Sequence, residues 1–445
     1  MKKKQVVVMT MAAVMACGAM TACGGSKSDA GNNAAAGSEA SGETGSAEGK
    51  QVLSVTTWDN ESTPQFQAVI DAYEEKNPDV EIKIIDTSAD EYNNSLGISL
   101  SAAQPDPDVI WVKDMGSMLQ MADKEQLLPI DEFIKKDNLD LSIYKGAAEQ
   151  LQYNGVSYAL PYRNDWYVLY YNKDLFDAAG VEYPSNDMTW QEYYDLAAKL
   201  TSGEGSSKVY GSHNHTWQAL VTNWAVQDGE HTVVEKDYSF MKPWYEEALA
   251  LQKNGYIQDY ATLKTSNLHY SGAFSQGNVA MMNMGTWFIS TLIDKVKAGE
   301  YTDCGNWGMV KYPHAEGVEP GSTLATITSL AIPTTAKDKD MSWDFVKFVC
   351  GEEGADILAS TGTIPAIMTD DIANMVASIE GFPADEGSKE ALQTANLYLE
   401  MPVSTKSSEM ETVLNEAHDN IMTGNSTIDE GIADMNEKIS AILAQ

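Results

Sequence analysis

The sequence predicts an α/β protein of two lobes, and three observations lead to this fold class. Residues 51–445, about 395 residues, exceed what one hydrophobic core usually covers. Their first part alternates strand patterns with helix patterns, which favours a parallel sheet with right-handed crossovers. No apolar run in this region approaches the roughly 20 residues that a membrane-spanning helix needs. We therefore expect two lobes, each a β-sheet flanked by helices.

The first elements follow one another closely along the chain. The apolar stretch 52–58 is typical of a buried strand that ends in a loop. Thr63 is placed to cap a helix over 64–76, with a proline in its first turn. The elements expected next are a strand at 80–84, a helix at 91–103 and a strand at 108–112.

Further helices are expected towards the C-terminus. Thr189 and Glu192 have the spacing of a capping box, which predicts a helix that begins there. Apolar residues recur at helical spacing in the last helix, of which Ile432 and Ile439 are examples. The ranges predicted to be helical are 243–254, 341–349 and 428–443.

The N-terminal 22 residues have the layout of a secretory signal peptide. Three lysines precede an apolar stretch at 6–20, and small residues then lead into Cys23. This ending resembles a bacterial lipobox, in which the cysteine is diacylated and becomes the mature N-terminus. The motif around Cys17 is a weaker match. The alternative is an ordinary signal peptide followed by an incidental cysteine.

The segment that follows, 23–50, is expected to be a disordered tether. It is rich in Gly, Ser, Ala and Asn and holds no aromatic residue, Val, Ile or Leu. Such a composition cannot bury enough apolar surface to offset chain entropy. A flexible coil of this length spans roughly 25–30 Å on average, so it would hold a folded body away from a membrane while leaving it mobile.

Charge and cysteine content exclude several classes of protein. The net charge is −36, which rules out nucleic-acid binding through phosphate contacts. Only Cys304 and Cys350 lie beyond the tether, so the cysteines form no disulfide framework, and we expect both to be small buried residues. We expect no cofactor.

Three segments carry a resemblance to a known family. Residues 161–176 hold an apolar strand, then Tyr-Asn, then a helix with Leu-Phe. Residues 274–287 hold phenylalanine and glycine before Ala-Met and Gly-Thr-Trp, and 361–366 read Thr-Gly-Thr-Ile-Pro-Ala. Together they resemble the family 1 extracellular solute-binding proteins, over essentially all of 51–445. Arg163 departs from the pattern, because many members carry a small residue there.

The resemblance implies a two-lobed, type II periplasmic-binding-protein-like fold. Each lobe would be a mixed β-sheet flanked by helices and discontinuous in sequence. The chain would cross between lobes near Arg163, near 311–321 and near 366–371. The lobe boundaries expected on this basis are 51–163 with 316–368 for lobe 1, and 164–315 with 369–445 for lobe 2.

Aromatic and polar residues at strand ends are the candidate ligand contacts. Ligands of open α/β sheets bind beyond the carboxyl ends of the strands. Ten Trp and 21 Tyr against nine Phe favour aromatics with a polar group. Sugar rings stack on aromatic planes, and their hydroxyl groups need polar partners. The candidates are Trp58, Asp59, Asp114, Arg163, Asp165, Trp217, Trp224 and Trp287.

Each candidate also has a purely structural interpretation. The alternative for a tryptophan is a place in the core, as we expect for Trp111, and the alternative for an aspartate is a helix cap. Arg163 is the only arginine in the chain, and its planar fork suits two hydroxyls or a carboxylate. An ion pair with Asp165 is the equal alternative. His213 and His215 suggest zinc, but no cysteine or third histidine lies nearby in the sequence, so no metal is expected.

The resulting expectation is a monomeric receptor outside the cytoplasm, anchored by a lipid on Cys23. It would capture a sugar or oligosaccharide and deliver it to the permease of an ABC importer. One alternative is a receptor for a cationic solute such as a polyamine, suggested by the acidity. Another is an enzyme acting on surface glycans, because paired carboxyls about 5–10 Å apart can cleave a sugar bond. No enzymatic activity is expected.

Overall fold

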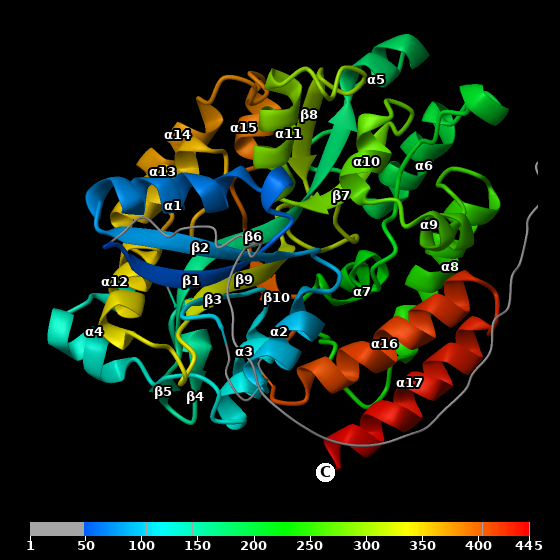
Figure 1. Ribbon diagram of the computed structural model, residues 1–445. Helices are drawn as coiled ribbons and strands as arrows, with labels where there is room; N and C mark the ends of the chain where they lie inside the picture. Colours follow the sequence, from blue (N-terminus) through cyan, green and yellow to red (C-terminus); the bar gives the residue numbers. More distant parts are fainter. Residues whose placement is uncertain (1–48, 103–105, 145, 403, 445) are drawn as a thin grey trace, which may run out of the picture. The chain divides into compact units, whose positions relative to one another are not determined.

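The computed structural model describes residues 49–102, 106–144, 146–402 and 404–444, in which strands of widely separated sequence lie side by side (Figure 1). The predicted signal peptide and nearly all of the predicted tether, including Cys23, lie outside the described residues. Residues 49–445 form one compact unit. In the part of the chain that the structure describes, no helix is long and apolar enough to cross a membrane.

The N-terminal strands have the predicted parallel arrangement. β1 (Gln51–Trp58) pairs in parallel with β2 (Val80–Thr87) along its whole length. The Thr56 amide donates to the Val109 carbonyl at 3.2 Å, which joins β1 to the segment that enters β3 (Ile110–Val112). The predicted order of strand, helix, strand, helix and strand is therefore confirmed. The intervening helices are η1 (Asn60–Ser62), α1 (Pro64–Lys76) and α2 (Tyr92–Leu100).

Two long strands organise the rest of the sheet. β6 (Ala159–Asn172) runs antiparallel to β9 (Thr323–Ala331) up to Trp166. From Tyr167 onwards it pairs instead with two other strands, one on each side. These are β7 (Met281–Gly285) and β8 (Trp307–Lys311). β9 also pairs with β3 at one end and with β10 (Leu397–Leu399) at the other. A short hairpin is formed by β4 (Gln152–Tyr153) and β5 (Val156–Ser157).

From Trp166 to Tyr171 the side chains of β6 alternate between two hydrophobic cores. Val168 and Tyr170 belong to the core that also contains β1, β3 and α1. Tyr167, Leu169 and Tyr171 belong to the other core. Successive residues of a strand point to opposite faces, so this part of the strand supplies both cores. All of β6 except Asn164 is buried.

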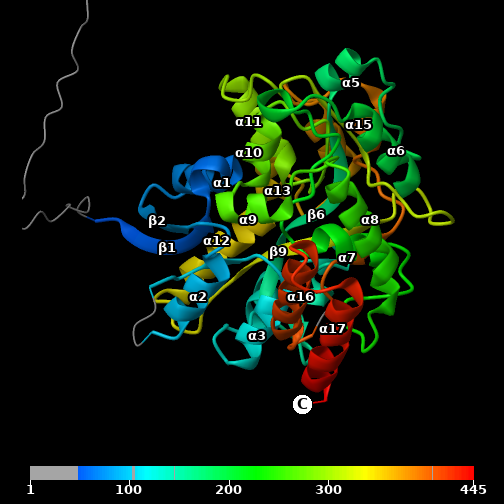
Figure 2. The ribbon, with the colours of Figure 1, turned by 90° about the vertical axis from the view of Figure 1, so that its right-hand side faces the viewer.

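Helices surround these strands (Figures 1 and 2). α12 packs on β6 and β9, and α16 and α17 pack against each other. The helices after β3 in the first half of the chain are α3 (Met115–Asp123), α4 (Asp131–Asp137), η2 (Leu141–Tyr144), η3 (Glu149–Leu151), α5 (Lys173–Ala179), α6 (Trp190–Leu200), η4 (Gly205–Ser207) and α7 (Ala219–Val226). Those of the second half are η5 (Ser239–Met241), α8 (Lys242–Lys253), α9 (Tyr260–Ser266), α10 (Tyr270–Ser275), α11 (Phe288–Lys297), α12 (Lys339–Cys350), α13 (Glu352–Ser360), α14 (Asp370–Ala377), α15 (Glu386–Glu390), α16 (Ser407–Met422) and α17 (Ile428–Leu443).

One of the helix caps predicted from the sequence is formed, and another is not. The predicted capping box of Thr189 and Glu192 is formed, and Thr427 forms a second with Glu430. The expectation that Thr63 caps α1 with its side chain is wrong. Its hydroxyl donates to the Asp59 carbonyl at 2.8 Å instead, because the preceding η1 turn brings that carbonyl within reach.

Residues expected in the interior are found there. Trp111 has no exposed surface and packs edge to face on Phe66 at 5.0 Å. Cys304 and Cys350 are both buried and free. Burial raises the pKa of the Cys304 thiol to about 12, so it is inert at neutral pH.

Buried histidines predict a loss of stability in acid. Burial lowers the pKa of His213 to about 4 and that of His418 to about 3, so both are neutral in the folded chain. An unfolded histidine takes up a proton near pH 6.5, so stability is complete above that pH and falls as the pH decreases towards 4. We expect a loss on the order of 2 kcal/mol per histidine by pH 5, measured by urea unfolding. His418→Gln should flatten this dependence, and an unchanged slope would contradict the assignment.

Candidate functional site

A cavity of about 330 Å³ opens where the ends of several strands converge. Its walls come from the ends of β1 and β3, from β6 and β9, and from loops and helices far along the chain. Six of the eight candidate residues line it. These are Trp58, Asp59, Asp114, Arg163, Trp217 and Trp287.

The end of β1 supplies the first aromatic surface and the first carboxylate. Trp58 is 7% exposed and packs edge to face on Phe66 at 5.0 Å. Asp59 adopts a left-handed backbone (φ 47°), and its Oδ1 accepts from the Ala89 amide at 3.1 Å. The turn therefore fixes the Asp59 carboxylate at the cavity wall.

The end of β3 supplies a cation and an acid. Lys113 Nζ donates to the Ala89 carbonyl at 2.7 Å and lies 5.2 Å from the Trp58 ring centroid. Burial lowers the pKa of Lys113. Asp114 caps α3 by accepting from the Ser117 amide at 2.7 Å, so the alternative of a helix cap is correct for it. It lines the cavity as well.

Arg163 and Asp165 form a buried ion pair on β6. Arg163 Nε lies 2.6 Å from Asp165 Oδ2, and the two side chains are 8% and 0% exposed. Asp165 Oδ1 accepts from the Thr286 hydroxyl at 2.8 Å. Burial raises the pKa of Asp165, and the Arg163 charge and the Thr286 hydrogen bond oppose that rise. Arg163 lines the cavity whereas Asp165 does not, so Asp165 holds the arginine from behind.

One part of the cavity wall is aromatic. Trp287 follows β7 and meets Tyr167 edge to face at 5.4 Å. The ring centroid of Trp217 lies 6.3 Å from that of Trp287 and 5.5 Å from that of Tyr270. We call Tyr167, Trp217, Tyr270 and Trp287 the aromatic wall. Trp224 is 1% exposed on the fully buried helix α7 and packs on Trp190 at 4.8 Å, outside the cavity lining.

Two glutamates that line the cavity were not among the candidates predicted from the sequence. Glu400 Oε1 accepts from the Tyr167 hydroxyl at 2.7 Å and from the Asn223 amide at 2.9 Å, and burial raises its pKa. Glu411, on α16, is accessible from the cavity. Desolvation within the cavity raises the pKa of Glu411 to about 7, and the charges of Asp114 and Glu400 add to this rise. Neither glutamate follows a predicted strand, so no periodic signal marked them.

His213 and His215 do not line the cavity. His213 Nδ1 pairs with Gln258 Oε1 at 2.9 Å, and His215 packs edge to face on Trp217 at 4.6 Å. No group of three metal-ligating side chains is found among the described residues.

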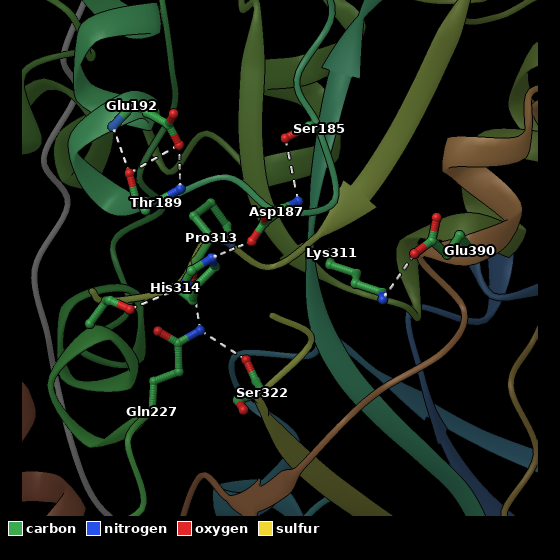
Figure 3. A network of polar contacts seen from close by, with 11 residues as sticks. Ser185, Asp187, Thr189, Glu192, Gln227, Lys311, Pro313, His314, Ser322 and Glu390 are labelled. Carbon is green, nitrogen blue, oxygen red and sulfur yellow. Dashed lines mark hydrogen bonds and ion pairs between the residues drawn. The ribbon is translucent and has the colours of Figure 1, made fainter. Parts of the chain in front are cut away.

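The segment between β8 and β9 is fixed by a polar network (Figure 3). Gln227 Nε2 donates to the Pro313 carbonyl at 2.7 Å and to the Ser322 carbonyl at 2.8 Å. His314 Nε2 lies 3.3 Å from Asp187 Oδ1. This segment is where the sequence predicted a second crossover, and the proposed lobe boundaries there and elsewhere stay predictions.

Comparison with known proteins agrees with this architecture. The family model described as bacterial extracellular solute-binding protein matches residues 59–356. The chain belongs to this family.

Solved structures similar to this chain cover nearly all of its described residues. A sugar transporter from Rhizobium etli, solved in an open conformation, is 44% identical over 88% of this chain and 99% of its own, with a TM-score of 0.73. An ABC substrate-binding protein from Listeria monocytogenes, in complex with cycloalternan, is 21% identical over 89% and 99%, with a TM-score of 0.75. The fold is therefore the two-lobed periplasmic-binding-protein fold.

A curated relative covers less of the chain. The sn-glycerol-3-phosphate-binding periplasmic protein UgpB of Brucella abortus is 27% identical over 268 residues. That match spans 56% of this chain and 59% of the relative's length.

The buried ion pair predicts non-additive effects on stability. Arg163→Met leaves the Asp165 carboxylate buried without its partner and should cost about 3–5 kcal/mol in urea unfolding. Adding Asp165→Asn removes that charge but keeps an acceptor for Thr286, so the double variant should recover much of the loss. Additive losses in the double-mutant cycle would contradict a direct pairing.

Proposed function

We propose that this chain is an extracytoplasmic receptor that captures a sugar or oligosaccharide in the cavity and delivers it to an ABC importer. The carrying observation is that Trp58 and the aromatic wall line one cavity together with polar groups of several kinds. Aromatic faces suit the apolar C–H faces of sugar rings. Carboxylates, amides and Arg163 suit hydroxyl groups, which need both donors and acceptors.

The Rhizobium etli structure supports the carbohydrate assignment. It is called a sugar transporter, and it shares 44% of its sequence with this chain over 99% of its own length. The relatives named for sn-glycerol-3-phosphate are more distant. An anionic phosphate also fits the cavity poorly, because Asp59, Asp90, Asp114, Glu400 and Glu411 line it.

The proposed mechanism is closure of two lobes over the ligand. In this scheme lobe 1 comprises 51–163 and 316–368, and lobe 2 comprises 164–315 and 369–445. Ligand shifts the balance towards the closed form by its differential affinity for the two forms. The receptor acts as a monomer, needs no cofactor and performs no catalysis. Its partner in the membrane is the importer permease.

A cationic solute is the second candidate. Five carboxylates line the cavity against two cations, Lys113 and Arg163. The charges of Asp114 and Glu400 act against a charge on Glu411, so a ligand amine bound there would offset that repulsion. Arg163 works against this candidate, because its own charge faces the same cavity.

A lipid on Cys23 is the proposed anchor. Residues 23–50 would then hold the binding body away from the membrane surface. The polar composition of that segment and the lipobox-like ending of the leader support this proposal.

Calorimetry against a ligand panel tests the proposed function. Mono- and oligosaccharides should bind, whereas spermidine and sn-glycerol-3-phosphate should not. Heat released by spermidine alone would replace the carbohydrate assignment with the cationic one, and a response to neither class would reject both.

Two tryptophan variants test the site itself. Trp287→Ala and Trp217→Ala should each weaken carbohydrate binding by about 1–3 kcal/mol, because each removes a stacking surface. Trp224→Phe is the matched control and should bind normally, since Trp224 lies outside the cavity. Unchanged affinity in both alanine variants, with the fold intact, would remove the aromatic wall from the binding site.

Metabolic labelling with a fatty-acid analogue tests the anchor. The unmodified chain and Cys17→Ser should both incorporate the label into the mature protein, whereas Cys23→Ser should not. Label retained by Cys23→Ser would exclude Cys23 as the lipidated residue.

A further inference from the structure

A second, much smaller cavity lies beneath the aromatic wall. It encloses about 10 Å³ and is lined by residues from α7 and the segment before it, from α8, α9 and the segment between them, and from α16. That volume is close to the roughly 10–15 Å³ that one water molecule needs on this measure. Asn214, His215 and His418 line it and are 5%, 7% and 2% exposed.

Each of these three residues has a buried atom without a protein partner. Among the described residues, Asn214 Nδ2, His215 Nδ1 and His418 Nε2 make no hydrogen bond. A buried polar atom left unpaired costs roughly 1–3 kcal/mol. Three such atoms around one cavity of this size indicate a shared bridging molecule.

The donor and acceptor pattern matches one water. Tyr193 donates to Asn214 Oδ1 at 3.4 Å, which leaves the Asn214 amide group as a donor. His418 Nδ1 lies 3.3 Å from the Tyr245 hydroxyl. If that hydroxyl donates, His418 Nε2 carries the proton and is the second donor. Burial lowers the pKa of His215 far below its ordinary value, so its ring is neutral. With the ring proton on Nε2, Nδ1 is the acceptor.

We propose that this cavity binds one ordered water molecule, which joins the segment containing Asn214 and His215 to α16. The water accepts from Asn214 Nδ2 and His418 Nε2 and donates to His215 Nδ1. A metal ion fits poorly, because no group of three ligating side chains occurs among the described residues.

The proposed water connects two parts of the large cavity. His215 packs edge to face on Trp217 at 4.6 Å and on Tyr270 at 5.6 Å, and both of these belong to the aromatic wall. α16 carries His418 to the small cavity and Glu411 and Asn415 to the large one. Asn214, His215 and His418 are therefore positioning residues for the wall and α16.

A high-resolution crystal structure of the chain is the direct test. It should show one ordered solvent peak within hydrogen-bond distance of all three atoms. No peak would overturn the proposal, as would direct contacts between the three side chains. An anomalous signal from a metal at that place would overturn it too.

Melting temperatures give an independent test, in which the direction of the change in melting temperature decides. His215→Phe keeps a ring against Trp217 but removes the acceptor of the water. The water then lacks one hydrogen bond, and both donors are unpaired if it leaves. The substitution should lower the melting temperature by roughly 1–4 °C. In a dry cavity the same change removes an unpaired polar atom, so an unchanged or higher melting temperature would overturn the proposal. His231→Phe, whose ring stacks on Phe240 away from both cavities, controls for the substitution.

Discussion

The passage of β6 from one set of strand partners to another is the constraint on which the rest of the structure depends. Up to Trp166 the strand is held by β9, and from Tyr167 it is held by β7 and β8. Arg163 and Asp165 form their ion pair just before this change of partners. Removing either side chain would leave the other charge buried without its partner, so the pair constrains this part of β6. The cavity lies beside this ion pair, and Asp165 supports Arg163 at the cavity wall.

The site combines side chains from distant parts of the sequence. Strand ends and a helix cap hold Asp59, Asp114 and Arg163, whereas Glu411 and Asn415 are carried by α16, late in the chain. A ligand contacting both groups would bridge segments that are separated by more than 200 residues, which is how a closing receptor links ligand binding to a change of conformation.

Local patterns predicted much of the fold and part of the site. The strand ends that carry Trp58, Asp59 and Asp114 were predictable, because the rule about carboxyl ends of parallel strands applies to β1 and β3. The prediction for Trp224 is wrong, because its polar and aromatic neighbours suggest a cleft wall while every residue of α7 is buried. Glu400 and Glu411 reach the cavity through tertiary packing of the C-terminal segment. Glu400 follows a strand of three residues, which is too short to give a periodic signal.

We propose that a carbohydrate lies between Trp58 and the aromatic wall and is held by Arg163. The decisive experiment is a crystal structure of the chain with a bound oligosaccharide. We expect a sugar ring stacked on Trp217 or Trp287, with the guanidinium of Arg163 donating to ligand oxygens. A bound oligosaccharide that touches neither the aromatic wall nor Arg163 would contradict it.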